Sequence, residues 1–104
     1  MKGNMGQMLK QAQRMQAEMA RVQEELKEES VEASVGGGAI KVVMGGDLTV
    51  KRVILDAAAV DPDETGMLED MIAAAVNEAL RQAQELAGSK MQRVTGGMSV
   101  PGLF

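Results

Sequence analysis

Three basic residues, Lys10, Arg14 and Arg21, are spaced so that one side of a helix would carry all of them. At about 100° per residue they fall within roughly 40° of one another. Point charges along an exposed helix suit contacts to phosphate groups, and such contacts carry little sequence information. The alternative is an ordinary solvated face, with partners four residues along the helix such as Glu18 for Arg14 and Glu25 for Arg21. Residue types and spacing leave both interpretations open.

Other chemistry is scarce, because the chain contains no cysteine and no histidine. Cys–His and Ser–His–Asp nucleophilic sites and Cys/His zinc sites are therefore excluded. Stacking of bases on an aromatic platform is nearly excluded too, since Phe104 is the only aromatic residue. The acids between residues 61 and 70 are explained by a helix N-terminus, which attracts negative charge. The sequence predicts no enzyme, no metal site, no cofactor and no small-molecule substrate.

The charges are unevenly distributed along the 104 residues, a length that suits one domain. The net charge of −4 argues against a partner that is itself a polyanion. However, all but one of the 15 acidic residues lie between Glu24 and Glu85. Residues 1–23 contain four basic residues against Glu18 alone, and residues 86–104 contain two basic residues and no acid. Both ends are therefore basic and the middle is acidic.

The basic side belongs to a long predicted helix, because residues 7–29 contain no glycine or proline. Apolar residues recur there at a and d positions of consecutive heptads, the spacing of a coiled-coil seam. The seam consists of Met5, Met8, Ala12, Met15, Met19, Val22 and Leu26. Gly6 weakens the first turn, so we expect the helix to begin there or slightly later. A helix of about 25 residues would be about 37 Å long and would overhang the remaining body.

This overhang predicts a homodimer, in which a second chain covers the seam. The predicted dimerisation residues are Met8, Met15, Met19, Val22 and Leu26. The alternative is a long helix that lies across its own domain. The basic side points roughly opposite to the seam and would face outward if the seam faces a partner.

The middle of the chain has the alternating pattern of β-strands, which we expect at residues 31–35, 39–44 and 48–55. Gly36-Gly37-Gly38 separates the first two strands, and Gly45-Gly46 has the spacing of a tight hairpin turn before the third. The triplet lacks the Lys-Ser/Thr of a phosphate loop and precedes a strand, so we interpret it as a turn. Short connections make the three strands an antiparallel sheet that needs a helix over one face.

A second helix is expected to provide that cover. Asp61 has the position of an N-cap, although Gly66 moves the expected regular start to about Met67. The wide apolar stripe of this helix, which includes Ile72, should face the sheet. The helix reaches at least Leu86, and residues 96–104 are expected to form a mobile tail. The predicted class is α+β, a single dimeric domain over residues 1–104 with the order α-β-β-β-α.

No apolar run approaches the roughly 20 residues that span a bilayer. The first residues lead into a polar amphipathic segment instead of the apolar core of a signal peptide. We therefore expect a cytoplasmic protein without a membrane partner.

An ordered set of motifs resembles the YbaB/EbfC family of small bacterial nucleoid-associated proteins. The set covers nearly the whole chain, and its most specific piece is the segment at residues 67–79, MLEDMIAAAVNEA. The other pieces are KQAQRMQ at residues 10–16, Gly36-Gly37-Gly38 before Ile40-Lys41-Val42, Thr95-Gly96-Gly97-Met98, and Pro101-Gly102.

The resemblance implies homodimers with an α-β-β-β-α arrangement, whose long helices project from a sheet-containing body in a shape likened to tweezers. Members of this family bind DNA, often with little sequence preference, and are not enzymes. Carried onto this chain, the resemblance places Lys10, Arg14 and Arg21 within reach of a duplex, and Lys90 and Arg93 are the matching candidates near the C-terminus.

The leading functional hypothesis is a homodimer that binds double-stranded DNA through phosphate contacts in the nucleoid and helps to organise the chromosome. The alternative is a dimeric adaptor, whose methionine-rich surfaces bind a protein of replication or recombination. Salt separates the two hypotheses, because binding to phosphates weakens steeply as salt rises.

Overall fold

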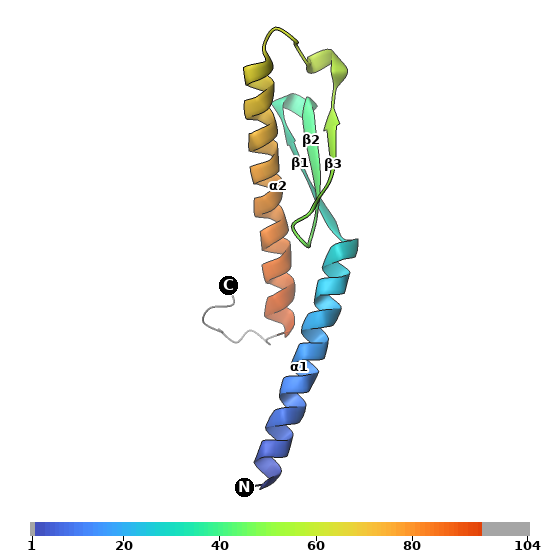
Figure 1. The fold of residues 1–104 in the computed structure, drawn as a ribbon, viewed down its shortest axis with the longest axis vertical. Coiled ribbons are helices and arrows are strands. Elements are labelled where there is room, and N and C mark those ends of the chain that lie inside the picture. The colour runs from blue at the N-terminus through green and yellow to red at the C-terminus, as the bar shows by residue number, and fades with distance from the viewer. Residues whose placement is uncertain (1, 95–104) are drawn as a thin grey trace.

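The computed structural model describes residues 2–94 and has the predicted α-β-β-β-α order (Figure 1). The elements are helix α1 (Lys2–Glu28), strands β1 (Ser30–Val35), β2 (Ile40–Gly45) and β3 (Val50–Leu55), and helix α2 (Thr65–Val94). Two single 3₁₀ turns, η1 (Gly36–Gly38) and η2 (Ala57–Ala59), join these elements. The expected tail at residues 96–104 lies outside the described residues.

Both helices begin earlier than the sequence predicted. α1 starts before Gly6, because an exposed helical glycine costs only about 1 kcal/mol relative to alanine and does not stop a helix of 27 residues. α2 likewise includes Gly66 and continues through Gly88. Asp61 is not the N-cap of α2. Its carboxylate accepts a hydrogen bond from the Asp63 amide at 2.9 Å and so closes a separate turn that precedes the helix.

The three strands form an antiparallel sheet in the order β1-β2-β3. Val35 pairs with Ile40, and Ile40 pairs with Leu55 on its other side. These three residues therefore lie side by side at one end of the sheet. The glycines of η1 all have positive φ, between 65° and 98°. Only glycine adopts this region freely, which explains the triplet at this connection.

The predicted two-residue turn at Gly45-Gly46 is wrong, because β2 includes Gly45 and β3 begins only at Val50. The turn between the two strands instead contains Leu48 in a positive φ of 66°. Gly46 serves another purpose. Its amide donates to the Glu29 carbonyl at 3.0 Å, and a Cβ atom on it would lie 2.8 Å from the Leu26 carbonyl oxygen. Glycine at this position therefore permits the hairpin to approach the end of α1.

The core lies between α2 and the face of the sheet formed by β1 and β2 (Figure 1). Alanines on α2 approach the sheet most closely and are fully buried at positions 75, 79 and 83. Opposite them, Ile40 and Val42 of β2 are also fully buried. Ile72 packs against this cluster from its edge and is only half-buried, because the small alanines bring the middle of the helix nearest to the strands.

β3 presents apolar side chains that α2 does not cover. Val53 pairs with the core residue Val42, and Leu55 pairs with Ile40, so both project from the face that α2 occupies. Nevertheless Val50, Val53 and Leu55 are between 43% and 46% exposed. Because α2 packs along β1 and β2, this part of the face is left uncovered in a single protomer.

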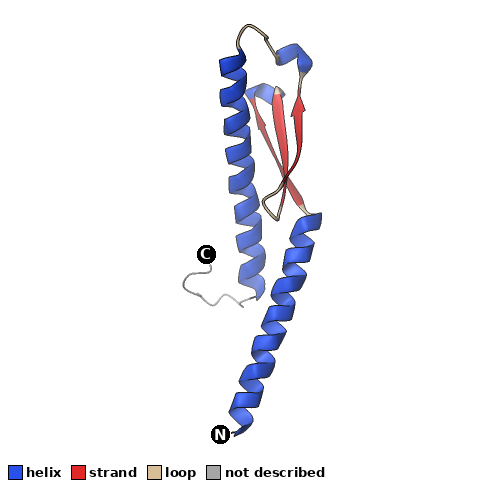
Figure 2. Cartoon of the chain, viewed as in Figure 1, coloured by secondary structure: helices blue, strands red, loops and turns tan. Residues whose placement is uncertain are grey.

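α1 is an arm that extends away from the sheet and past the end of α2, and the molecule measures 73 × 23 × 16 Å (Figure 2). Its last turns attach it to the body through Val22 and Leu26, which are 3% and 5% exposed. Lys51 on β3 donates a hydrogen bond to the Lys27 carbonyl at 2.8 Å, near the end of the helix. The first part of the seam has no such cover, and Met5, Met8 and Met15 are exposed.

The buried alanine face of α2 predicts a specific sensitivity to side-chain size. Ala79→Leu adds volume between α2 and the sheet, and overpacking of this kind costs about 1–3 kcal/mol. We expect the melting temperature to fall by roughly 4–8 °C for each kcal/mol. Ala74→Leu is the matched control, because Ala74 lies on the exposed side of the same helix. Equal melting temperatures for the two variants would refute this packing.

Gly46 supplies a second prediction. Gly46→Ala forces a methyl group against the Leu26 carbonyl and should loosen the attachment of α1, lowering the melting temperature. Gly88→Ala is the control, since a Cβ at Gly88 meets nothing within 4 Å and alanine favours a helix by up to about 1 kcal/mol. Thermal unfolding should therefore shift in opposite directions for the two variants. A Gly46→Ala protein as stable as its parent would contradict the close approach.

Candidate nucleic-acid interface

The arm presents two cations that are free to contact a partner. Lys10 and Arg14 lie on the exposed part of α1, and neither forms an ion pair with any residue between 2 and 94. Gln7 and Gln11 line a shallow depression with them, and the carboxylate beside Arg14, that of Glu18, is paired with Arg21. Lys10 and Arg14 have the exposure and charge that contacts to phosphates require.

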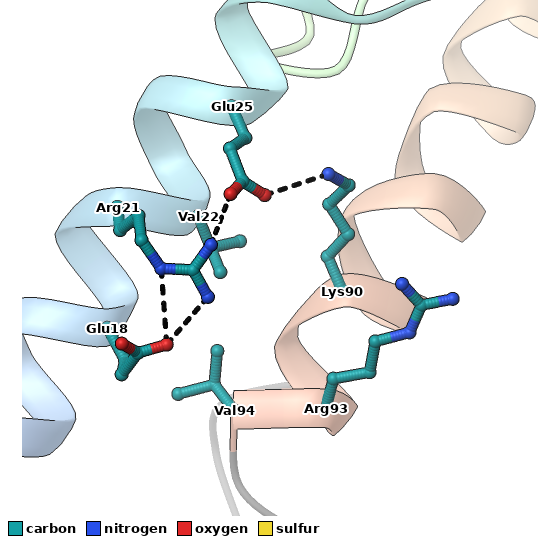
Figure 3. A pocket seen from close by; sticks show the side chains of 7 residues that line it. All are labelled: Glu18, Arg21, Val22, Glu25, Lys90, Arg93 and Val94. Carbon is teal, nitrogen blue, oxygen red and sulfur yellow. Dashed lines mark hydrogen bonds and ion pairs between the residues drawn. The ribbon is translucent and has the colours of Figure 1, made fainter.

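Arg21, the third cation predicted to contact DNA, is already engaged by the protein. One of its terminal nitrogens lies 2.6 Å from Glu18 Oε2, and the other forms an ion pair with Glu25 (Figure 3). The hydrogen bond from Arg21 holds the pKa of the Glu18 carboxyl below its usual value. Of the two ion pairs expected for a solvated face, the pair of Arg21 with Glu25 is therefore present, whereas Glu18 pairs with Arg21 instead of Arg14.

Lys90 joins the two helices. Its Nζ lies 3.0 Å from Glu25 Oε2 and 2.8 Å from Glu29 Oε2, and its side chain is only 15% exposed. Hydrogen bonds to Glu29 and Glu25 raise the pKa of Lys90, and the bond from Lys90 lowers the pKa of Glu25. This predicted DNA contact is therefore also part of the junction between α1 and α2.

A hollow of about 170 Å³ lies between the helices at this point, and we call it the junction hollow (Figure 3). It is lined by Glu18, Arg21, Val22, Glu25, Lys90, Arg93 and Val94. Arg93 is exposed in the last turn of α2 and forms no ion pair within the described part of the chain. The structure thus brings three of the five predicted cations together around one hollow.

The remaining two cations lie farther along the arm. Seven residues separate Arg14 from Arg21, which corresponds to about 10 Å along the helix. A shallow depression lined by Gln11, Arg14, Met15, Glu18 and Val94 connects the junction hollow with this part of the arm. The five cations therefore follow one side of the arm and its junction with α2.

Sequence reasoning anticipated only part of the ion pairing that neutralises this surface. The spacing of Arg21 and Glu25 was visible in the sequence, but the pairing of Lys90 with Glu25 joins residues 65 positions apart. Nothing in the local pattern indicates that contact.

Among residues 2–94, no group of acids is arranged to hold a metal ion. No helix within these residues is long and apolar enough to cross a membrane.

The nearly full length of the chain matches proteins named for association with the nucleoid. A protein of Acetivibrio thermocellus called a nucleoid-associated protein is 52% identical over 103 residues, covering 98% of this chain and 91% of its own length. A nucleoid-associated protein of Pelotomaculum thermopropionicum is 49% identical over 104 residues, covering 100% of this chain and 99% of its own length.

The fold also occurs in a solved structure. The crystal structure of an uncharacterized protein from Helicobacter pylori matches with a TM-score of 0.74, over 88% of this chain and 94% of that one. At 17% sequence identity this likeness concerns the fold alone. The model of the YbaB/EbfC DNA-binding family matches residues 1–98. Together with the two relatives at about 50% identity, this match shows that the chain belongs to the YbaB/EbfC DNA-binding family.

Proposed function

We propose that this protein is a homodimer that binds double-stranded DNA through phosphate contacts with little sequence preference, and that it helps to organise the chromosome. The observation that carries the proposal is the exposed arm with unpaired Lys10 and Arg14. Basic side chains on a projecting helix can contact a duplex without interference from the acidic body. Phosphates are alike in every sequence, so contacts of this kind do not distinguish between bases.

Uncovered apolar surface supports the homodimer. Val50, Val53 and Leu55 continue the core face of the sheet, and they are between 43% and 46% exposed without a helix over them. A second copy would bury such a surface in a symmetric dimer, the commonest assembly of identical chains.

The seam of α1 offers further surface to the second copy. Met8 is 67% exposed and Met15 is 37% exposed, while Met19 is half-buried. Val22 and Leu26, which the sequence also assigned to the dimer, are already buried within one protomer. The proposed dimer contacts on the arm are therefore chiefly Met8, Met15 and Met19.

The proposed location is the nucleoid within the cytoplasm, in keeping with the relatives named nucleoid-associated proteins. A net charge of −4 per chain suits modest affinity, because the acidic body repels DNA while the arm attracts it. Affinity in the non-specific range is appropriate for a protein that covers many sites.

Light scattering tests the dimer. We expect a mass of about twice 11.0 kDa at micromolar concentration, and we expect Val53→Glu to reduce it toward 11.0 kDa because the new charge would be buried between protomers. Arg52→Glu is the matched control, since Arg52 precedes Val53 and lies on the other face of the sheet, so this variant should remain dimeric. An 11.0 kDa parent protein would contradict the homodimer.

Salt dependence tests the DNA contacts. We expect binding to unrelated duplexes to weaken with salt at a slope of roughly −4 to −5 in log affinity against log salt, corresponding to about four to six phosphates. Lys10→Glu/Arg14→Glu should flatten the slope and weaken binding to every duplex by a similar factor. Fluorescence anisotropy at several salt concentrations measures both quantities.

The matched control for this experiment is Lys41→Glu/Arg52→Glu, which makes the same change of charge on the exposed outer face of the sheet. This variant should keep a slope close to that of the parent. If the arm variant leaves affinity and slope unchanged, the arm does not bind DNA and the adaptor hypothesis becomes the better one.

A further inference from the structure

The junction hollow holds carboxylates where an incoming phosphate would find cations. Arg21 and Lys90 both direct their nitrogens at Glu25, and Arg21 also binds Glu18 at 2.6 Å (Figure 3). Carboxylate and phosphate oxygens accept the same charge-assisted hydrogen bonds from arginine and lysine. In the free protein, the oxygens of Glu25 and Glu18 occupy positions that a phosphate oxygen could take.

We propose that the junction hollow is a binding site for a phosphate of the DNA backbone, which Glu25, assisted by Glu18, occupies in the free protein and vacates when DNA binds. This inference rests on the proposed function, because the phosphate belongs to the duplex that the arm contacts. Arg21 and Lys90 are the groups that exchange a carboxylate for the phosphate. Arg93 lines the same hollow without an ion pair in the described chain, and its guanidinium lies on the side of Lys90 away from Arg21 (Figure 3).

The exposure of Arg21 and its two carboxylate partners makes such an exchange feasible at Arg21, whereas Lys90 is only 15% exposed and retains its contact with Glu29. The side chains of Arg21, Glu18 and Glu25 are 56%, 48% and 40% exposed, and ion pairs in contact with water contribute little to stability. Breaking them therefore costs little, and the released carboxylates remain solvated. A duplex carries a dense array of phosphates and can outcompete a single weakly held carboxylate.

Glu29 has a different role in the junction. Its Oε2 atom is shielded from solvent and lies 2.8 Å from Lys90 Nζ. This contact keeps the ammonium of Lys90 in place when Glu25 leaves. The side chains of Glu29 and Glu25 are similarly exposed, at 42% and 40%, but Glu25 is shared between Lys90 and Arg21 whereas Glu29 forms no ion pair with Arg21, so we assign the exchange to Glu25.

The site is also aligned with the rest of the interface. A shallow depression beside the junction hollow is lined by Arg14 and Glu18, so the hollow opens toward the unpaired cations of the arm. The separation of about 10 Å between Arg14 and Arg21 equals the rise of about three nucleotides along the axis of a duplex, at 3.4 Å each. One strand can therefore contact the arm and the junction hollow together.

The test compares Glu25→Gln with Glu28→Gln in binding to a mixed-sequence duplex of about 30 base pairs. Both variants remove one charge from the last turns of α1, but Glu28 forms no ion pair in the described chain and releases no cation. Glu25→Gln should tighten binding by about threefold or more and steepen the salt slope by about 0.9 for each phosphate gained. Glu28→Gln should change affinity by less than about twofold, since exposed charges are screened. Equal gains for the two variants would overturn the proposal.

A second comparison asks whether Glu25 acts through the cations it holds. Repeating Glu25→Gln in an Arg21→Gln/Lys90→Gln background should abolish its advantage over Glu28→Gln, whereas a general repulsion of DNA by Glu25 would leave the advantage intact and overturn the proposal. If thermal unfolding shows that Lys90→Gln destabilises the contact between α1 and α2, the comparison is made in an Arg21→Gln background instead. In that background, the gain in affinity of Glu25→Gln over Glu28→Gln should fall by about half. A different result would contradict the proposed function itself, namely DNA binding that Lys10→Glu/Arg14→Glu leaves unchanged.

Discussion

The attachment of α1 to the body determines where every proposed DNA contact lies. Only the last turns of this 27-residue helix are held, through the buried side chains of Val22 and Leu26 and the close approach of Gly46. Hydrogen bonds from Lys51 and the Gly46 amide to carbonyls at the end of the helix fix its direction. The rest of the arm follows as a rigid rod, so a displacement at this junction would move Lys10 and Arg14 by a larger distance.

The core that supports this junction consists largely of small side chains. Buried alanines let α2 lie close to β1 and β2, and the helix then continues past the sheet to bring Lys90 to α1. The same arrangement leaves β3 uncovered, because one helix cannot span three strands at this close distance. Tight packing on two strands and exposed apolar surface on the third thus have a common cause, and the exposed surface is available to a second copy.

The order of elements could be predicted from the sequence, because hydrophobic periods are local and distinguish helices from strands. The partners that depend on tertiary distance could not. The Gly45-Gly46 pair was interpreted as a hairpin turn, since the approach of Leu26 to Gly46 is invisible in a local pattern. Lys90 was identified as a candidate DNA contact, but its ion pairs with Glu25 and Glu29 come from the crossing of two helices. Candidate cations could therefore be named from spacing and resemblance, and the pair of Arg21 with Glu25 from local spacing, but the ion pairs of Lys90 could not be predicted.

The basic side of the arm, and not the sheet, is expected to contact DNA. Nuclear magnetic resonance signals of the protein during titration with a short duplex test this expectation most directly, because each residue reports separately. We predict that signals of Lys10 and Arg14 shift progressively, and that the shifts vanish when salt is raised. Signals of Lys41 and Arg52, on the exposed outer face of the sheet, should stay in place. Shifts concentrated at Lys41 and Arg52, with the arm unaffected, would contradict the account.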